Sequence, residues 1–305
     1  METVLENDCL TRFLLERSGV RGVLVHLDDT WQEVASRAPY PAPVAARLGE
    51  TCAAAALFTG HVKVDGRLSV QMRGTGTLRT LFAECTAAGT LRGIARHGEL
   101  GPQAEDAAAL GPRDFGEGSV LAITIESTPP GARETTRYQG LVGLDADTLA
   151  GAFEAYFQQS EQLPTRVLLA VREGRAAGLM LQLLPADAGR AGDADGWTRC
   201  SALFDTLGPA ELADTPVREL LWRLFHEEAV RLLDQQPLRF ACSCSRARVA
   251  DMLRGLGQEE AEQALQAGQL EVHCEFCGQG YHFDAAEIAG LFAQAPTVPG
   301  PAGLQ

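Results

Sequence analysis

The sequence has no uninterrupted run of about 18 apolar residues, which is close to the shortest segment that can form a membrane-spanning helix. Its first residues, Met1-Glu2-Thr3-Val4-Leu5-Glu6, are acidic and are not followed by a long apolar stretch. They therefore lack the features of a secretory signal peptide. We expect a cytoplasmic protein with no membrane partner. Apolar residues still make up 46% of the chain, which is enough for a hydrophobic core.

Positive charge is also scarce. The 305 residues carry 26 lysines and arginines against 40 aspartates and glutamates, a formal net charge of −14. A surface this acidic repels a phosphate backbone, so we expect no nucleic-acid partner. No GxxxxGK[ST] motif is present, and Gly74-Thr75-Gly76 lacks the third glycine of a dinucleotide-binding loop. We therefore expect no ATP.

The first 186 residues favour an α+β domain in which a mostly antiparallel sheet is packed by helices. Most strands follow one another without crossover helices, which argues against a doubly wound sheet. The Asp65-Gly66 dipeptide between two alternating segments predicts a β-hairpin with strands at 61–64 and 67–73. Further strands are expected at 21–27, 78–85, 90–96, 119–126, 136–144, 165–172 and 178–184, and helices at about 41–60 and 149–162.

Residues 187–238 are predicted to form a helical linker. Small and polar residues at 187–196 indicate a domain boundary. Thr215 and Pro216 then begin a helix that we expect to continue to about Asp234. Its apolar residues recur at helical spacing: Val217, Leu220, Leu221, Leu224 and Phe225. The linker cannot bury this stripe by itself, so it must dock on a neighbouring part of the protein.

Residues 239–295 are predicted to form a small domain of their own. Ser245 can cap a helix that continues to Leu256, and Asp284 with Glu287 can cap a last helix. A short helix at 258–267 and two strands, at 269–273 and 280–283, complete this domain. We expect residues 296–305 to be disordered.

The chain has eight cysteines, and a cytoplasmic protein does not use them as a disulfide framework. Four are scattered singly and are interpreted as packing residues: Cys9, Cys52, Cys85 and Cys200. The other four form a CxC pair and a CxxC pair separated by 29 residues: Cys242 with Cys244, and Cys274 with Cys277. Two close pairs of thiolates can supply the tetrahedral ligands of one Zn²⁺. The glycine after the second pair, Gly278, suits a tight turn whose amides point at the sulfurs.

The residues alone leave two interpretations of this zinc site open. A purely structural ion would stabilise a domain that buries too little apolar surface, by about 10–16 kcal/mol. Alternatively the site is a switch, because an oxidant can convert each close thiolate pair to a disulfide and release the metal. The small domain would then unfold and the docked linker would loosen. His273 and His282 flank the cluster and are weaker candidates for ligands, since four thiolates already complete the shell.

Several short motifs accompany the cysteine pairs along nearly the whole chain. They are Arg21-Gly22, Tyr40-Pro41-Ala42-Pro43-Val44, Arg92-Gly93-Ile94-Ala95-Arg96, Tyr138-Gln139-Gly140-Leu141-Val142-Gly143-Leu144, Tyr156-Phe157, Ser160-Glu161-Gln162-Leu163-Pro164-Thr165 and Leu221-Trp222-Arg223-Leu224-Phe225-His226-Glu227-Glu228. Together with the cysteines, this combination resembles the 33-kDa chaperonin family, the redox-regulated heat-shock holdases of bacteria and some organelles.

The resemblance implies a chaperone rather than an enzyme, inactive while one Zn²⁺ is held by four reduced cysteines. Oxidation together with unfolding stress would form the disulfides Cys242–Cys244 and Cys274–Cys277 and release the zinc. The zinc domain and linker would unfold, and the protein would dimerise and hold unfolding client proteins without ATP. In the reduced form the linker would cover an apolar face of the first domain. The client-binding residues expected in the linker are Trp197, Leu203, Phe204, Leu220, Leu221, Leu224 and Phe225.

Two functions from other classes compete with this one. A thiol–disulfide oxidoreductase would use Cys274-Glu-Phe-Cys277, but that chemistry prefers a helix N-terminus in a βαβ setting, and here the pair lies between two expected strands. A zinc-ribbon adaptor would bind nucleic acid or protein. Residues 239–305 contain four arginines, no lysine and eight carboxylates, which disfavours nucleic acid.

Overall fold

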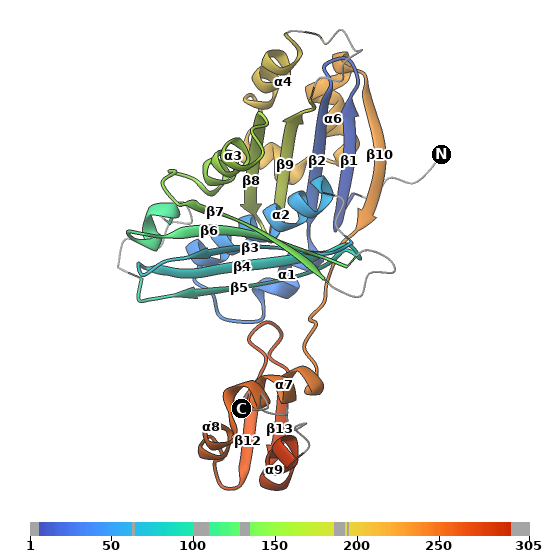
Figure 1. Ribbon diagram of the computed structural model, residues 1–305. Coiled ribbons are helices and arrows are strands. Elements are labelled where there is room, and N and C mark those ends of the chain that lie inside the picture. The colour runs from blue at the N-terminus through green and yellow to red at the C-terminus, as the bar shows by residue number, and fades with distance from the viewer. Residues whose placement is uncertain are drawn as a thin grey trace, which may run out of the picture. The chain divides into compact units, whose positions relative to one another are not determined.

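The structure, a computed structural model, describes residues 6–62, 65–100, 110–128, 135–185, 193 and 195–293. The chain divides into two compact units, Met1–Ala241 and Cys242–Gln305 (Figure 1). The first unit therefore includes the residues assigned to the linker. The α+β class is confirmed, since antiparallel sheets are combined with helices throughout.

One sheet of the first unit has five antiparallel strands in the order β10-β1-β2-β9-β8. Their bounds are β1 (Cys9–Leu15), β2 (Val20–Leu27), β8 (Thr165–Arg172), β9 (Arg175–Leu183) and β10 (Val230–Pro237). The inner strands β2 and β9 are almost wholly buried because helices cover both faces of this sheet. This explains why their sequences are nearly continuous apolar runs.

The second sheet has six strands in the order β11-β5-β4-β3-β6-β7. Its strands are β3 (Gly66–Arg73), β4 (Leu78–Thr86), β5 (Thr90–His97), β6 (Val120–Ser127), β7 (Thr136–Gly143) and the short β11 (Arg239–Phe240). All neighbours are antiparallel except β11 and β5, which are parallel. A 3₁₀ turn, η1 (Pro112–Phe115), lies beside β4.

The helix α2 (Ala42–His61) forms the centre of the largest apolar core and contacts strands of both sheets (Figure 1). Pro43 lies in its first turn, where a missing N–H is harmless. Ala53 to Ala56 are fully buried, and their small side chains let the surrounding strands pack closely. Two more helices, α1 (Asp29–Ala35) and α3 (Leu149–Ser160), also contact α2. The N-cap of α3 is Thr148, whose side chain accepts a hydrogen bond from the Gly151 N–H.

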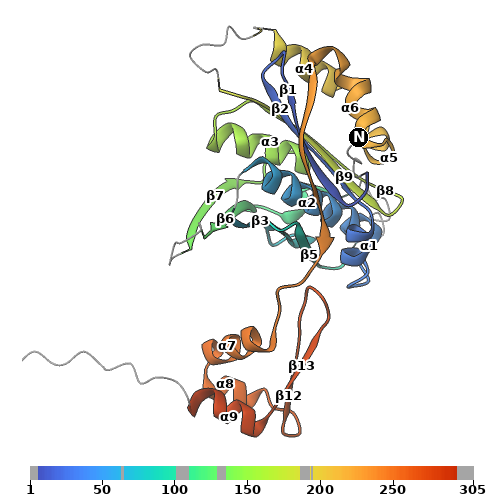
Figure 2. The same ribbon diagram turned by 90° about the vertical axis from the view of Figure 1, so that its right-hand side faces the viewer.

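Three helices cover the other face of the five-stranded sheet (Figure 2). They are α4 (Gly196–Phe204), α5 (Pro209–Asp214) and α6 (Val217–Phe225). Their apolar side chains form a second buried cluster with those of β1, β2, β8 and β9. The expectation that the apolar stripe of the linker must dock on a neighbour is confirmed within this unit.

The second unit is small. It contains α7 (Arg246–Leu256), α8 (Gln258–Gln263), the hairpin of β12 (Gln269–His273) and β13 (Gly280–Asp284), and α9 (Ala285–Ala293). The Ser245 cap is confirmed by a hydrogen bond from the Arg248 N–H to its side chain, and the Glu287 N–H likewise donates to Asp284. Within residues 242–293, seven side chains form its buried apolar core. The expected disordered tail, 296–305, lies outside the described residues.

The predicted hairpin across Asp65-Gly66 is wrong. His61 belongs to α2, and β3 pairs with β4 and β6 instead of with the preceding segment. The helix extends this far because the His61 side chain is buried and interacts with Arg21, whose guanidinium lies 2.8 Å from the imidazole Nε2. Residues 63 and 64, the rest of the expected first strand, lie outside the described residues.

The predicted helix from Thr215 to about Asp234 is also wrong in its second half. The helix α6 ends at Phe225 and is followed by a 3₁₀ turn, η2 (His226–Glu228). Ala229 then adopts a left-handed conformation with φ of 53°, which stops any continuation of the helix. The chain leaves this turn as β10 and pairs with β1. The strand β1 and the helix α1 were not predicted at all.

Candidate metal centre

The four paired cysteines lie at two positions in the second unit. Cys242 and Cys244 precede α7, directly before its cap Ser245. Cys274 and Cys277 lie in the turn that joins β12 to β13. Antiparallel pairing of β12 and β13 holds this turn closed, so the position of the second pair is fixed by the hairpin.

The turn of the second pair is built around Gly278. Its N–H donates to the Cys274 carbonyl at 2.8 Å, and the Cys274 N–H donates to the Gln279 carbonyl at 2.9 Å. The φ of Gly278 is +72°, in the left-handed region that favours glycine. Backbone hydrogen bonds from Phe276 and Cys277 reach the Cys274 sulfur. The expectation of a tight turn with amides directed at the sulfurs is confirmed.

The four sulfur atoms lie within 4.8 Å of one another. The Sγ atoms of Cys242 and Cys274 are 3.6 Å apart, and those of Cys244 and Cys277 are 3.4 Å apart. Tetrahedral zinc with Zn–S bonds of about 2.3 Å places its sulfurs about 3.8 Å from one another. The spacing therefore fits one tetrahedral ion. Both of these contacts join one cysteine of the first pair to one of the second, so the cluster ties the segment before α7 to the hairpin.

The thiols of the cluster shift one another's pKa values. Burial and the neighbouring sulfurs together raise the pKa of Cys277 to about 12, and the pKa of Cys274 is also raised, chiefly by burial. For Cys242, burial acts in the same direction but is outweighed by hydrogen bonds from Cys244 and the other sulfurs, which lower its pKa to about 7. Four thiolates thus require a cation to balance their charge, and a dication such as Zn²⁺ deprotonates its thiol ligands outright.

Tyr281 is a part of this centre that sequence reasoning missed. Its hydroxyl donates to the Cys244 sulfur at 3.1 Å, and this hydrogen bond is the main cause that raises the pKa of Tyr281 to about 12. Tyr281 and the core residue Phe283 lie two residues apart on β13, so they share one face of the hairpin. This alternation along the strand could have indicated from the sequence that Tyr281 lies on the same side as the core. A donor to a metal-binding sulfur orients the ligand and tunes its affinity.

The two flanking histidines do not join the cluster. His273 and His282 are exposed, and each imidazole lies near Glu271, at 3.1 and 3.7 Å. The group of candidate ligands within the described residues contains the four cysteines and no histidine. The four remaining cysteines are fully buried in the apolar cores of the first unit, as expected for packing residues: Cys9, Cys52, Cys85 and Cys200. Burial raises the pKa of Cys9 to about 11 and that of Cys85 to about 12, which makes these thiols poor nucleophiles.

The expected client-binding residues all lie on α4 and α6, against the five-stranded sheet. Five are buried: Phe204, Leu220, Leu221, Leu224 and Phe225. Trp197 and Leu203 are partly buried against the same cluster. The ring of Phe225 stacks on that of Phe13 from β1 with a centroid separation of 6.3 Å. In this structure the surface is therefore covered.

Comparison with known proteins identifies the family. The family model for the Hsp33 protein matches residues 8–284. The chain is 42% identical to the 33 kDa chaperonin of Pseudomonas fluorescens strain SBW25, covering 97% of each chain, and 46% identical to that of Azotobacter vinelandii, covering 94% of this chain and 95% of the relative. A crystal structure of the 33 kDa chaperonin of Thermotoga maritima has the same fold, with a TM-score of 0.79 at 21% identity, over 94% of this chain and 98% of that one. No helix among the described residues is long and apolar enough to cross a membrane. The chain belongs to the Hsp33 family.

Proposed function

We propose that this protein is a redox-regulated, ATP-independent holdase of the cytoplasm that protects unfolding proteins from aggregation during oxidative stress. The observation that carries the proposal is the four-sulfur cluster in a unit whose described residues include a buried apolar core of seven. So small a core cannot hold the unit folded by itself, whereas a structural zinc supplies about 10–16 kcal/mol. The stability of this unit therefore depends on the reduced state of its cysteines.

Oxidation would remove the metal in two equivalent steps. In each pair, one thiolate attacks a peroxide oxygen to form a sulfenic acid, and the O–O bond breaks with release of water after protonation. The second thiolate then attacks that sulfur, the S–O bond breaks, and a second water leaves. Each pair thus loses two electrons to one peroxide molecule and gains one S–S bond. Disulfides no longer supply the negative charge that holds Zn²⁺, so the ion departs.

Disulfides within each pair, Cys242–Cys244 and Cys274–Cys277, are part of the proposal. While the unit is folded, sulfur atoms of different pairs also lie close together, at 3.4 and 3.6 Å. Once the metal leaves and the unit unfolds, closure within a pair involves a much shorter loop than closure across the 29 intervening residues. The entropy of loop closure then favours the local disulfides, with the Cys242–Cys244 ring the more strained and the more readily reduced.

The chaperone surface would be the interface that α4 and α6 now close. These helices bury an apolar cluster that includes Leu220, Leu224 and Phe225 against β1, β2, β8 and β9. Release of this segment exposes both halves of the cluster, and large exposed apolar patches bind other apolar surfaces. Unfolding clients supply such surfaces, and dimerisation of the oxidised protein would extend the patch.

The decisive experiment follows client aggregation and zinc release together. A heat-unfolding client is incubated with reduced protein and with peroxide-treated protein, while a chromogenic chelator reports free zinc. We expect suppression of aggregation only after oxidation, with release of one Zn²⁺ from each four-cysteine site. Equal suppression by the reduced protein would contradict the redox switch.

Substitution of a ligand supplies the matched control. Cys277→Ser should lower zinc content and loosen the second unit. Cys52→Ala removes a thiol from an alanine-rich helix far from the cluster in sequence, and its zinc content should stay unchanged. Unchanged zinc in Cys277→Ser would show that the ligands are assigned wrongly, whereas turnover of a disulfide substrate by the unmodified protein would point to an oxidoreductase.

A further inference from the structure

The strand β1 is an inner strand of its sheet only because β10 pairs with it. The pairing runs from Cys9 opposite Pro237 to Leu15 opposite Val230, with a shift in register between Arg12 and Phe13. β10 directly follows α6 and η2, in the segment that the proposed function requires to unfold. This inference therefore rests on the proposed function and concerns what the departure of β10 would uncover.

Apolar side chains contribute little to the attachment of the second half of β10, from Leu233 on. None of its residues is fully buried, and Leu233 remains 51% exposed. Val230 and Leu232, at the start of β10, pack partly buried against the apolar cluster of α4, α5 and α6. The second half contacts β1 through polar groups: Asp234 forms an ion pair with Arg12 at 2.8 Å, and the Gln235 side-chain amide donates to the Thr11 hydroxyl at 2.8 Å. An ion pair as accessible to solvent as that of Asp234 stabilises a strand only weakly.

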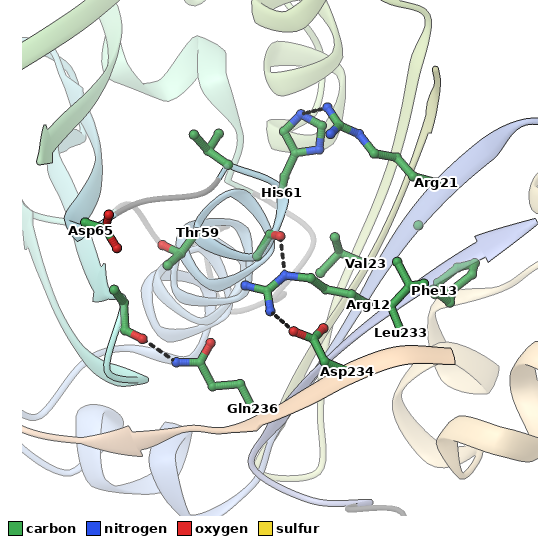
Figure 3. Close-up of a pocket in the computed structure, with 14 residues that line it drawn as sticks. Arg12, Phe13, Arg21, Val23, Thr59, His61, Asp65, Leu233, Asp234 and Gln236 are labelled. Carbon is green, nitrogen blue, oxygen red and sulfur yellow. Dashed lines mark hydrogen bonds and ion pairs between the residues drawn. The ribbon is translucent and has the colours of Figure 1, made fainter. Parts of the chain in front are cut away.

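A cavity of about 600 Å³ lies between β10 and the C-terminal end of α2 (Figure 3). Leu233, Asp234 and Gln236 line it from β10, and Gly60 and His61 line it from α2. This part of β10 therefore faces open space where a well-packed strand would contact apolar side chains. This half of the strand is held mainly by its backbone hydrogen bonds to β1.

The two strands differ as sheet edges. β10 carries Arg231, Asp234 and Pro237, the charged residues and proline that protect natural sheet edges from pairing with other chains. β1 reads Cys-Leu-Thr-Arg-Phe-Leu-Leu, and its Phe13 and Leu15 are fully buried. The guanidinium of Arg12, its one charged group, donates to the Gly60 carbonyl at 2.6 Å and is thereby held toward α2 (Figure 3). Without β10, β1 would be a long apolar edge with no protection.

The backbone groups that would be uncovered can be identified. At one end of the pair the Leu238 N–H donates to the Asp8 carbonyl at 2.6 Å, and at the other the Glu16 N–H donates to the Ala229 carbonyl at 3.3 Å. Hydrogen bonding to one neighbour alternates along an antiparallel strand. The residues of β1 whose N–H and C=O groups point toward β10 are therefore Leu10, Arg12 and Leu14.

We propose that β1 is a binding site for extended apolar segments of unfolding proteins, which pair with its edge in place of β10. Backbone hydrogen bonds supply affinity in such strand addition without demanding a particular sequence, which suits a chaperone with many clients. Phe13 and Leu15 lie on the face that α6 covers, so its release adds an apolar contact beside the open edge. The β1 edge can bind only client segments with an extended backbone, whereas the apolar face can bind any hydrophobic segment.

Hydrogen exchange at single-residue resolution tests this directly, with urea-unfolded luciferase as the client probe. The amides of Leu10, Arg12 and Leu14 should exchange slowly in the reduced protein and faster by about tenfold or more after oxidation at a temperature that also loosens the linker. They should become slow again when the client is bound. The alternating amides of Thr11, Phe13 and Leu15 face β2 and are the internal control, which should stay protected throughout.

Each other outcome has a definite meaning. Client held without renewed protection of these three amides would overturn the inference and leave the proposed function intact. Protection that persists after oxidation at that temperature would overturn it too, because β10 would not have left. If these amides become protected again without client, and more so at higher protein concentration, the β1 edge would instead pair with a second copy of this chain. Failure of the oxidised protein to hold any client would instead count against the proposed function.

A covalent staple provides the second arm. Thr11 and Gln235 are directly opposite and their side chains touch, so Thr11→Cys with Gln235→Cys places two thiols in reach of a disulfide. The stapled protein should release zinc on oxidation as the unmodified protein does, yet suppress luciferase aggregation several-fold less. Thr11→Ser with Gln235→Ser is the matched variant without a cross-link and should keep its activity. Full activity of the stapled protein would refute a role for this edge.

Discussion

Replacing Phe225 by alanine should release the linker without any oxidation. Phe225 lies on α6 with its side chain fully buried, and its ring stacks on Phe13 of β1. Truncation of a buried phenylalanine destabilises a protein by about 3–5 kcal/mol. This loss of stability weakens the docking of the helices α4, α5 and α6 on the five-stranded sheet, because Phe225 belongs to the apolar cluster between these helices and the sheet.

This magnitude is large enough to change the resting state. Every 1.4 kcal/mol changes an equilibrium about tenfold, so the undocked fraction should rise roughly a hundredfold to several-thousandfold. The four cysteines lie in the other unit and are untouched. We therefore expect reduced Phe225→Ala protein to keep its zinc and yet suppress aggregation of a heat-unfolding client. Limited proteolysis between residues 196 and 237 should accelerate in parallel.

Trp222 supplies the control on the same helix. Its side chain is 66% exposed, and substitution of an exposed residue changes stability by no more than about 0.5 kcal/mol. Reduced Trp222→Ala should therefore stay inactive and resist proteolysis. Should Phe225→Ala be cleaved faster in this segment and still fail to hold the client, docking of the linker would not be what keeps the protein inactive. Equal activation by Trp222→Ala would show that burial is not the cause.

Three smaller perturbations test other parts of the structure. Tyr281→Phe removes the hydrogen bond to Cys244 and should weaken zinc binding about 10–100-fold in a chelator competition, and unchanged affinity would show that the hydroxyl is a bystander. Burial raises the pKa of Glu50 from 4.5 to about 7, so the native state binds a proton more tightly and its stability falls as pH rises between these values. Glu50→Gln should flatten this dependence in thermal unfolding from pH 5 to 8, and an unaltered profile would place the effect elsewhere. Glu228 is fully buried and accepts a hydrogen bond from Arg199, so Glu228→Gln should speed proteolysis of residues 196–237 without changing zinc content.

Predictions from the sequence were most accurate where a residue pattern is compatible with a single structure. Two close pairs of cysteines predicted a single four-sulfur cluster, and the structure brings the sulfurs within 4.8 Å of one another. Most strands and the long helices were predicted from apolar periodicity, because burial imposes that periodicity directly. The stripe from Val217 to Phe225 likewise predicted a docked helix, although nothing in the sequence says that its partner is the five-stranded sheet.

The failures share a cause, which is that the deciding partner is distant in sequence. β10 has polar residues and no clean alternation, and it becomes a strand because β1, more than 200 residues earlier, offers an unpaired edge. The same partner explains why β1 was overlooked, since its seven residues are buried on both faces and show no period. Tyr281 was missed because its role depends on Cys244, which α7 and α8 separate from it in the chain.

The inactive form would be stabilised in two independent ways, and oxidation removes only one of them. Zinc stabilises the second unit, whereas the linker is held by its own buried side chains, each worth roughly 1.5–3 kcal/mol. The chain between them is also anchored in the first unit, since Leu238 is buried and β11 pairs with β5 just before Cys242. Unfolding of the second unit removes neither these anchors nor the apolar contacts that the helices α4, α5 and α6 make with the sheet. Release then requires a condition that also weakens the docking, and heat or another unfolding stress does so at the moment when clients themselves unfold.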